Sequence, residues 1–172
     1  MEQNAAQAVT VRSVGVKYGL ISAMISIVFF LVLVFTGQNA FDNTWNWIGL
    51  IFSIAILVLA QKNYKDSGDG FMSYGQGVGI AFWIALISLI IGGLFTYLYT
   101  TVIDTTVMDM MYQKQAEEME KNGMTSEQID MAAKWTRMLF WPIYIFFGLF
   151  FGVLVGVIVS IFTQKKRAEP TF

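Results

Sequence analysis

Four long stretches without a charged side chain constrain the fold of this chain more than any other feature. Asp, Glu, Lys and Arg are absent from residues 18–41, 43–61, 70–103 and 138–164. A helix needs roughly 20 mainly apolar residues to cross about 30 Å of hydrocarbon, and each stretch is close to that length or above it. The sequence therefore predicts an all-α membrane protein with a bundle of four transmembrane helices, placed near residues 15–36, 44–61, 76–101 and 138–163.

Composition supports a single membrane domain over residues 1–172. Hydrophobic residues make up 56% of the chain and charged residues 13%, whereas a soluble domain carries about 25% charged residues. The first apolar stretch is longer than the usual signal-peptide core of about 7–15 residues. We therefore expect an uncleaved first span, and little of the chain remains for a separate soluble domain.

The distribution of Lys and Arg predicts the orientation, because short cytoplasmic loops carry an excess of these residues. With the N-terminus inside, the inner segments hold seven basic and four acidic residues, and the outer segments hold four basic and eight acidic ones. The inner net of +3 and the outer net of −4 agree with the chain's −1. Both termini are predicted to be cytoplasmic.

The segment 104–137, between the third and fourth spans, reads as an extracytoplasmic helical hairpin. Its first part lacks Gly and Pro and is rich in Met, Gln, Glu and Lys, which are good helix formers. Asn122-Gly123 is a typical helix stop, and Thr125 with Gln128 forms a capping box that starts the next helix. We expect the third span to run unbroken into the first hairpin helix, and the second hairpin helix to run into the fourth span.

Small residues at four-residue spacing predict where the helices pack, because close approach of backbones drives helix association in lipid. The fourth span carries such a ladder at Gly148, Gly152, Gly156 and Ser160, and the first span has Gly15 and Gly19. Two interpretations remain open. The ladder packs within one four-helix bundle, or it joins two copies in a homo-oligomer.

The residue types in this chain give little support for catalysis, metal binding or ion-coupled transport. The chain has no Cys and no His, which removes thiol chemistry, the commonest general base and the commonest metal ligand. Proton relays and ion-coupled carriers usually place ionisable groups at membrane depth, and the spans hold none beyond Lys17 at the edge of the first. We predict no catalytic residue, no metal site and no cofactor. An acidic chain is also not expected to bind nucleic acid.

The start of the third span is a candidate contact for a lipid headgroup. Glycines at a helix N-terminus can present free backbone N–H groups to an anion, and two lysines lie close in sequence. The candidate residues are Lys62, Lys65, Ser73, Gly75 and Gly77. The alternative interpretation is a flexible turn followed by close helix packing.

Several segments, taken together, resemble a known family. They are Tyr18-Gly19, Lys62-Asn63-Tyr64-Lys65, Met72 to Gly77, Phe95 to Asp104 and Gly123 to Ile129. The pattern resembles the bacterial membrane proteins of domain-of-unknown-function family 4199, over nearly the whole chain. The resemblance implies a bacterial inner membrane protein. It supplies no activity, cofactor or catalytic residue.

The expected function is therefore that of a non-enzymatic protein of the envelope, acting through lipid or protein contacts, with segment 104–137 as the surface for a protein partner. The alternative is a small transporter or channel component. One observation would favour this alternative: a single aqueous path lined by polar residues such as Ser22, Ser26, Ser53, Ser88 and Thr96.

Overall fold

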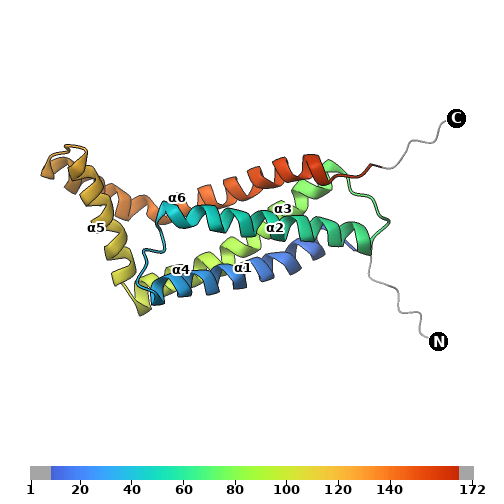
Figure 1. Ribbon diagram of the computed structural model, residues 1–172, viewed down its shortest axis with the longest axis horizontal. Helices are drawn as coiled ribbons and strands as arrows, with labels where there is room; N and C mark the ends of the chain where they lie inside the picture. Colours follow the sequence, from blue (N-terminus) through green and yellow to red (C-terminus); the bar gives the residue numbers. More distant parts are fainter. Residues whose placement is uncertain (1–8, 167–172) are drawn as a thin grey trace.

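The computed structural model describes residues 9–166, and in that range the chain forms one elongated helical bundle (Figure 1). The elements in order are α1 (Val11–Phe35), α2 (Asn43–Ser67), α3 (Tyr74–Ser88), η1 (Leu89–Gly93), α4 (Leu94–Leu98), η2 (Tyr99–Ile103), α5 (Thr106–Lys121) and α6 (Ser126–Thr163). We call the continuous run from α3 to η2 the third span. We call the end of the bundle where α1 begins and α6 ends the terminal end, and the opposite end the α5 end.

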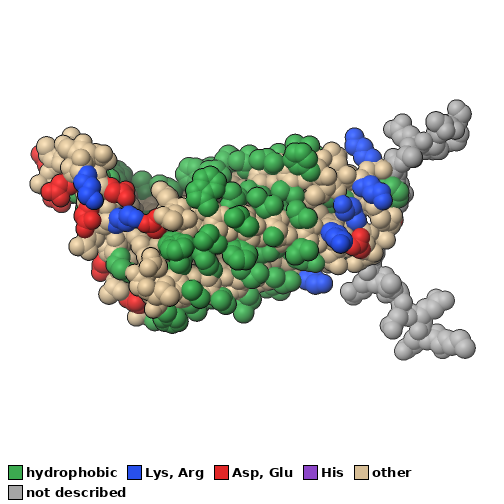
Figure 2. All heavy atoms as spheres, in the orientation of Figure 1, with side chains coloured by type: hydrophobic (Ala, Val, Ile, Leu, Met, Phe, Trp, Pro, Cys, Tyr) green, Lys and Arg blue, Asp and Glu red, His purple; other side chains and the backbone are tan. Residues whose placement is uncertain are grey.

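Four helices are long and apolar enough to cross a membrane, as the sequence predicted. They are Val11–Phe35, Asn43–Ser67, Tyr74–Ile103 and Ser126–Thr163. Figure 2 shows hydrophobic side chains over the middle of the bundle and charged side chains toward its two ends. The protein is a multi-pass membrane protein by the length and composition of its helices. Three residues counted for the orientation, Glu2, Arg167 and Glu169, lie outside the described residues.

Local signals at the helix ends were read correctly from the sequence. The Thr125 hydroxyl accepts a hydrogen bond from the backbone N–H of Gln128, and the Oε1 of Gln128 accepts one from the backbone N–H of Thr125, so the capping box is present. Gly123 adopts φ +81° directly after α5 ends, a conformation that favours glycine. Thr10 and Ser73 begin α1 and α3 with capping boxes of the same kind.

The third span is irregular, and it ends at Ile103 instead of running on into α5. Two π-helical turns, η1 and η2, interrupt it, and the hydroxyl of Thr100 donates to the carbonyl of Thr96 at 2.8 Å within this region. Asp104 is extended, with φ −144° and ψ 95°, and its carboxylate accepts from the N–H of Thr106 at 3.0 Å. The expectation of an unbroken helix into α5 was wrong, because Asp104 ends one helix and starts the next.

The second helix of the predicted hairpin does continue into the fourth span. α6 has 38 residues and passes through Pro142 without ending. In Figure 1, α5 and the first turns of α6 extend beyond the ends of α1 and α2. The extracytoplasmic location of this segment stays a prediction.

α2 has buried residues along only one half of its length. Its buried residues, Ile56, Leu57, Ala60 and Gln61, all lie in the half toward the terminal end. In the other half, Trp47 is 71% exposed and Ile51 is 67% exposed. Figure 1 shows α1 and α2 close together at the terminal end and apart at the α5 end. This divergence leaves space between α2 and the other three spans.

Candidate functional site

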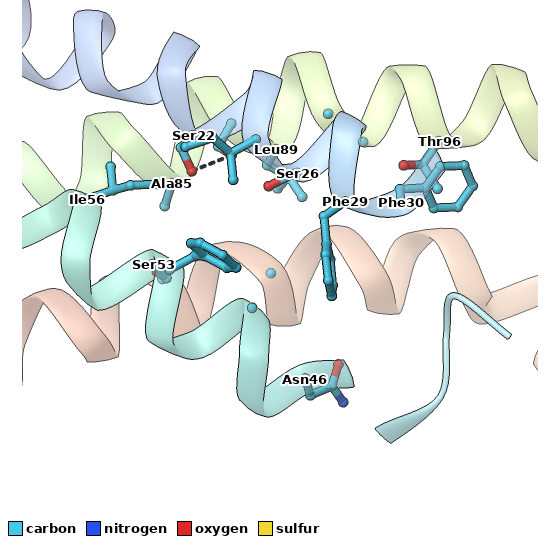
Figure 3. Close-up of a pocket in the computed structure, with 18 of the residues that line it drawn as sticks. Ser22, Ser26, Phe29, Phe30, Asn46, Ser53, Ile56, Ala85, Leu89 and Thr96 are labelled. Atoms are coloured by element: carbon cyan, nitrogen blue, oxygen red, sulfur yellow. Dashed lines mark hydrogen bonds between the residues drawn. The ribbon is translucent and has the colours of Figure 1, made fainter. Parts of the chain in front are cut away.

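A cavity of about 430 Å³ occupies the space beside the diverging half of α2. Its walls come from α1, α2, the third span and α6, with Ala40 and Phe41 of the α1–α2 connection at the α5 end (Figure 3). Ligand pockets in proteins usually measure about 300–1,000 Å³. The cavity is therefore large enough for a small molecule.

Glycines on three helices help to make this room. Gly49 of α2, Gly92 and Gly93 of η1, and Gly148 and Gly152 of α6 all line the cavity. A Cβ atom added at Gly49 would meet no atom within 4 Å, and one at Gly92 would meet only Ser26, at 4.0 Å. A larger side chain at Gly49 thus has free space to enter.

Hydroxyl side chains line the cavity in the middle of the spans. Ser22, Ser26, Ser53, Ser88 and Thr96 all contribute to its wall, which is the set of residues that the sequence analysis singled out for a transporter or channel component. Ser88 donates to the Oγ of Ser22 at 3.1 Å. In Figure 3, Ser26 on α1 and Ser53 on α2 lie on opposite sides of the cavity. Among the described residues, neither of these two side chains makes a hydrogen bond.

The rest of the lining is uncharged and rich in aromatic rings. No Asp, Glu, Lys or Arg belongs to the described residues that line the cavity. Six aromatic side chains do, namely Phe29, Phe30, Phe41, Trp45, Phe52 and Tyr144. Placing an unpaired charge in such surroundings is strongly unfavourable. The cavity is therefore suited to an uncharged ligand.

Aromatic contacts close two sides of the cavity. The Phe29 ring on α1 lies 6.4 Å from the Trp45 ring and 6.4 Å from the Phe52 ring, both on α2. At the α5 end, the Phe41 ring lies 6.4 Å from Phe30 and 5.3 Å from Phe140 of α6. Phe29 thus spans the gap between α1 and α2, and Phe41 covers the end that faces α5.

An ion pair holds the connection that carries Phe41. Lys114 of α5 contacts the carboxylate of Asp42, and the backbone N–H and hydroxyl of Thr44 also donate to Asp42. The Lys114 hydrogen bond, together with those from Thr44, holds the pKa of Asp42 well below its usual range, and the same ion pair raises the pKa of Lys114. α5 is therefore coupled to the covered end of the cavity.

A buried polar cluster closes the terminal end. Gln61 of α2 is fully buried. Its Nε2 donates to the carbonyl of Gly77 at 3.1 Å and to the hydroxyl of Ser160 at 2.9 Å, and its Oε1 accepts from the hydroxyl of Thr163. We call these four residues the Gln61 cluster. Buried polar groups are costly unless they are hydrogen-bonded, so the cluster joins α2, α3 and α6 firmly.

Two neighbouring contacts extend this closure. The Nζ of Lys65 donates to the carbonyl of Thr163 at 2.8 Å, and Met72 and Lys165 exchange two backbone hydrogen bonds at 3.0 and 2.9 Å. The role of Gln61 was not predicted from the sequence. Its only signal was a polar amide at the end of the charge-free stretch 43–61, which does not identify partners on other helices.

The glycine ladder of α6 faces the third span. A Cβ atom at Gly156 would come within 2.2 Å of the Ala81 Cβ, and one at Gly152 within 2.6 Å of the Ala85 Cβ. At Gly148 the nearest atom is a methyl of Leu89, at 3.0 Å. The fourth member, Ser160, belongs to the Gln61 cluster. The ladder thus lies at a contact within one chain, and homo-oligomerisation stays a prediction.

The two glycines of α1 also face the third span. A Cβ atom at Gly15 would come within 2.3 Å of the Trp83 Cβ, and one at Gly19 within 2.8 Å of the Ile87 Cβ. α1 and α6 therefore both pack closely on the third span. α2 has no comparable contact in the half that lines the cavity, because a Cβ at Gly49 meets open space.

Only some of the candidate residues for a lipid headgroup are free to contact one in the structure. Gly77 is buried, and a Cβ there would come within 2.6 Å of the Ser160 hydroxyl, so this residue serves helix packing instead. The Nζ of Lys65 is hydrogen-bonded to the carbonyl of Thr163 at the end of α6. Lys62, Ser73 and Gly75 are exposed. A headgroup contact at these three exposed residues stays a prediction.

The fold and the cavity define an all-α, multi-pass membrane protein with an uncharged, partly open cavity between its helices. No group of three or more His, Cys, Asp or Glu residues that could hold a metal ion occurs in the described part of the chain. The family model described as "protein of unknown function (DUF4199)" matches residues 17–165. The chain belongs to this family, as the resemblance indicated. No curated protein and no solved structure matches it.

Proposed function

We propose that this protein is a non-enzymatic protein of the bacterial inner membrane that binds a small molecule in the cavity between α2 and the other three spans. The observation that carries this proposal is a cavity of about 430 Å³, uncharged, lined by five hydroxyl residues, and placed among helices that could span a membrane. Small-molecule sites are typically apolar pockets with a few convergent polar groups.

The lining supports binding rather than catalysis. A serine nucleophile requires an adjacent general base that removes its proton. The described residues around the cavity supply hydroxyls, one amide and aromatic rings, but no carboxylate, Lys or His. The only hydrogen-bonded pair of serines there joins Ser88 to Ser22, and a second serine is not a base of the required strength. We infer that a bound molecule is held and not converted.

From the predicted orientation we infer on which side of the membrane the cavity lies. With both termini in the cytoplasm, the Gln61 cluster lies toward the cytoplasmic face, and the cavity lies between the middle of the bilayer and its outer face. A molecule in the outer leaflet would then reach the cavity without passing the Gln61 cluster.

The cavity can be filled to test binding. Gly49→Phe should place a ring in the free space, because a Cβ there meets nothing within 4 Å. Ile51→Phe is a matched control on the same helix, at a residue that is 67% exposed and does not line the cavity. Both variants and the wild type are purified in nanodiscs from the native membrane, and their small-molecule extracts are compared by mass spectrometry. We expect a co-purifying molecule that Gly49→Phe loses and Ile51→Phe retains. Equal extracts from all three proteins would contradict the proposal.

A small transporter or channel component is the second candidate, and the five hydroxyl residues on the cavity wall favour it. Transport would require the Gln61 cluster to separate, because it closes the path at the terminal end. Proteoliposomes loaded with the molecule identified above distinguish the two functions. Flux that Gly49→Phe abolishes would indicate transport, whereas binding without flux would indicate a binding protein.

A protein partner remains part of this proposal. Segment 104–137 holds α5 and the first turns of α6, which extend beyond α1 and α2 (Figure 1). A tagged wild-type protein and a variant with Gly/Ser residues in place of 108–121 are compared after crosslinking in the native membrane. We propose that a partner is captured by the wild type alone. Identical captured proteins would place the partner contact outside residues 108–121.

A further inference from the structure

We propose that the cavity takes an uncharged, single-chain amphiphile from the surrounding lipid, with its hydroxyl or carbonyl group among the serines in the middle of the spans and its chain leaving between α2 and α6. This inference rests on the proposed function, because it names the chemical class of the molecule bound in the same cavity.

The serines indicate the polar group of the ligand. Ser22, Ser26, Ser53 and Ser88 lie near the middle of their helices and line the cavity together. Ser22 and Ser88 are paired with each other, at 3.1 Å. Ser26 and Ser53, on opposite sides of the cavity (Figure 3), have no hydrogen-bond partner in the described part of the chain. Ser26 is exposed and Ser53 partly buried, and within the hydrocarbon region there is little water to supply a partner, so a ligand hydroxyl or carbonyl would be a hydrogen-bond partner for either of them.

The absence of charge around these serines restricts the ligand further. A carboxylate, phosphate or ammonium group at this depth would be buried without an opposite charge, since the described lining contains no ionisable acid or base of either sign. Unpaired buried ions are among the most unfavourable groups in a protein or a membrane. The polar group must therefore be neutral, which rules out a phospholipid headgroup at the serines.

The contacts between the helices indicate where a ligand would enter the cavity. α1 and α6 both pack on the third span through glycines, Phe29 spans the gap from α1 to α2, and Phe41 covers the α5 end. α2 and α6 are joined at the terminal end by the Gln61 cluster. Toward the α5 end, no hydrogen bond, ion pair or ring contact between described residues joins α2 to α6. We therefore place the route of the chain between α2 and α6, where none of these contacts closes the cavity.

The volume and the lining of the cavity suit a ligand with one hydrocarbon chain. A cavity of about 430 Å³ lies at the lower end of the usual range for ligand pockets, about 300–1,000 Å³, which suits a single chain better than two. Phe52 of α2 and Tyr144 of α6 both contribute rings to the cavity lining. They offer an apolar surface along which the chain would pass into the bilayer.

A series of probes with one chain length and different head groups tests this class. Dodecane, dodecanol, dodecanoate and dodecylammonium are added to the full-length protein in maltoside micelles, and the unfolding temperature is followed. A ligand that binds only the folded state raises this temperature. Gly49→Phe serves as the reference, because effects of the probes on the micelle are common to both proteins.

We expect dodecanol to raise the unfolding temperature of the wild type by about 5 °C more than that of Gly49→Phe when it is present at about one hundred times its Kd. The two charged probes should give no such difference. Ser26→Ala combined with Ser53→Ala should reduce the dodecanol effect to that of dodecane, and should leave the dodecane effect unchanged.

The possible failures can be told apart. If dodecanoate or dodecylammonium stabilises as well as dodecanol and Gly49→Phe removes the effect, the proposed binding function stands and the uncharged class is wrong. If the double serine variant responds fully to dodecanol, the assignment of the polar group to the serines is wrong. If Gly49→Phe responds as the wild type does to every probe, the cavity is not the site and the proposed function fails as well.

The route between α2 and α6 is tested by joining these two helices. The chain has no native Cys, so Phe52→Cys with Tyr144→Cys allows one bifunctional thiol crosslinker to bridge this side. Phe29→Cys with Phe52→Cys bridges the α1 side as the control. Each pair is compared with its own uncrosslinked form. We expect dodecanol exchange to slow at least tenfold only in the first pair. Equal slowing in both pairs, or in neither, would overturn the route between α2 and α6.

Discussion

The Nε2 of Gln61 on α2 donates a hydrogen bond to the hydroxyl of Ser160 on α6 at 2.9 Å. The two residues are 99 positions apart in the chain, and this bond lies at the only half of α2 that has buried residues. It therefore determines where α2 is held, and hence where the cavity begins.

Gln61→Leu should weaken the bundle. The substitution removes three side-chain hydrogen bonds and leaves the Ser160 hydroxyl and the Gly77 carbonyl without this partner. Leaving a buried polar group unsatisfied costs about 1–3 kcal/mol, and we expect a loss in this range from reversible unfolding in detergent. The same substitution at Gln113, an exposed residue of α5, is the control. A loss at Gln61 no larger than at Gln113 would show that the cluster does not stabilise the bundle.

Gly156→Ala should destabilise the protein, and Ala81→Gly should restore it. A Cβ at Gly156 would lie 2.2 Å from the Ala81 Cβ, so the helices must separate unless one of the two methyl groups is absent. Overpacking of this kind costs about 1–3 kcal/mol. We expect the single variant Gly156→Ala to lose stability within that range and the double variant to regain most of it in thermal unfolding. Additive losses would show that this pair is not in contact.

Val153→Leu is the control for the ladder as a whole. Val153 lies beside Gly152 on α6 but outside the four-residue spacing. Gly152→Leu should lower the unfolding temperature clearly, since a Cβ there would lie 2.6 Å from the Ala85 Cβ. Val153→Leu should change it little. Similar losses at the two positions would contradict a special role for the ladder face.

The orientation can be tested with single cysteines, because the chain contains none. Asn122 and Asp66 are both exposed, at the α5 end and the terminal end respectively. The charge distribution predicts that a membrane-impermeant thiol reagent labels Asn122→Cys, and not Asp66→Cys, in intact spheroplasts. The opposite labelling pattern would reverse the orientation and would place the cavity toward the cytoplasm.

Acid should loosen the contact between α5 and the α1–α2 connection. The pKa of Asp42 is lowered in the folded protein, mainly by the hydrogen bond from Lys114. The ion pair therefore contributes stability above the unfolded pKa of about 3.9, and this contribution is lost as the pH falls from there through the folded pKa. Proteolysis of segment 104–125 by pepsin should accelerate over this range. In Asp42→Asn the cleavage should be fast at every acidic pH tested, and an unchanged profile would contradict the coupling.

The number of spans, the ends of α5 and α6 at Gly123 and Thr125, and the family could all be predicted from the sequence. These features depend on local properties. A stretch needs enough apolar residues to cross hydrocarbon, and a helix end needs a side chain that satisfies its own backbone. The break at Asp104 is also local, since Asp104 lies among the weak helix formers Thr101, Val102, Thr105 and Thr106, but it was missed because the segment lacks Gly and Pro.

The cavity and the Gln61 cluster were decided by the tertiary structure. The sequence identified a set of polar residues that could line one path, namely Ser22, Ser26, Ser53, Ser88 and Thr96. They line a common cavity only because α2 diverges from the other spans. The sequence contained Gln61, Gly77 and Ser160, yet nothing in their spacing joined them. Which helices become neighbours depends on the packing of whole surfaces, such as the close approach of Gly156 to Ala81, and that packing sums contacts between residues far apart in the chain.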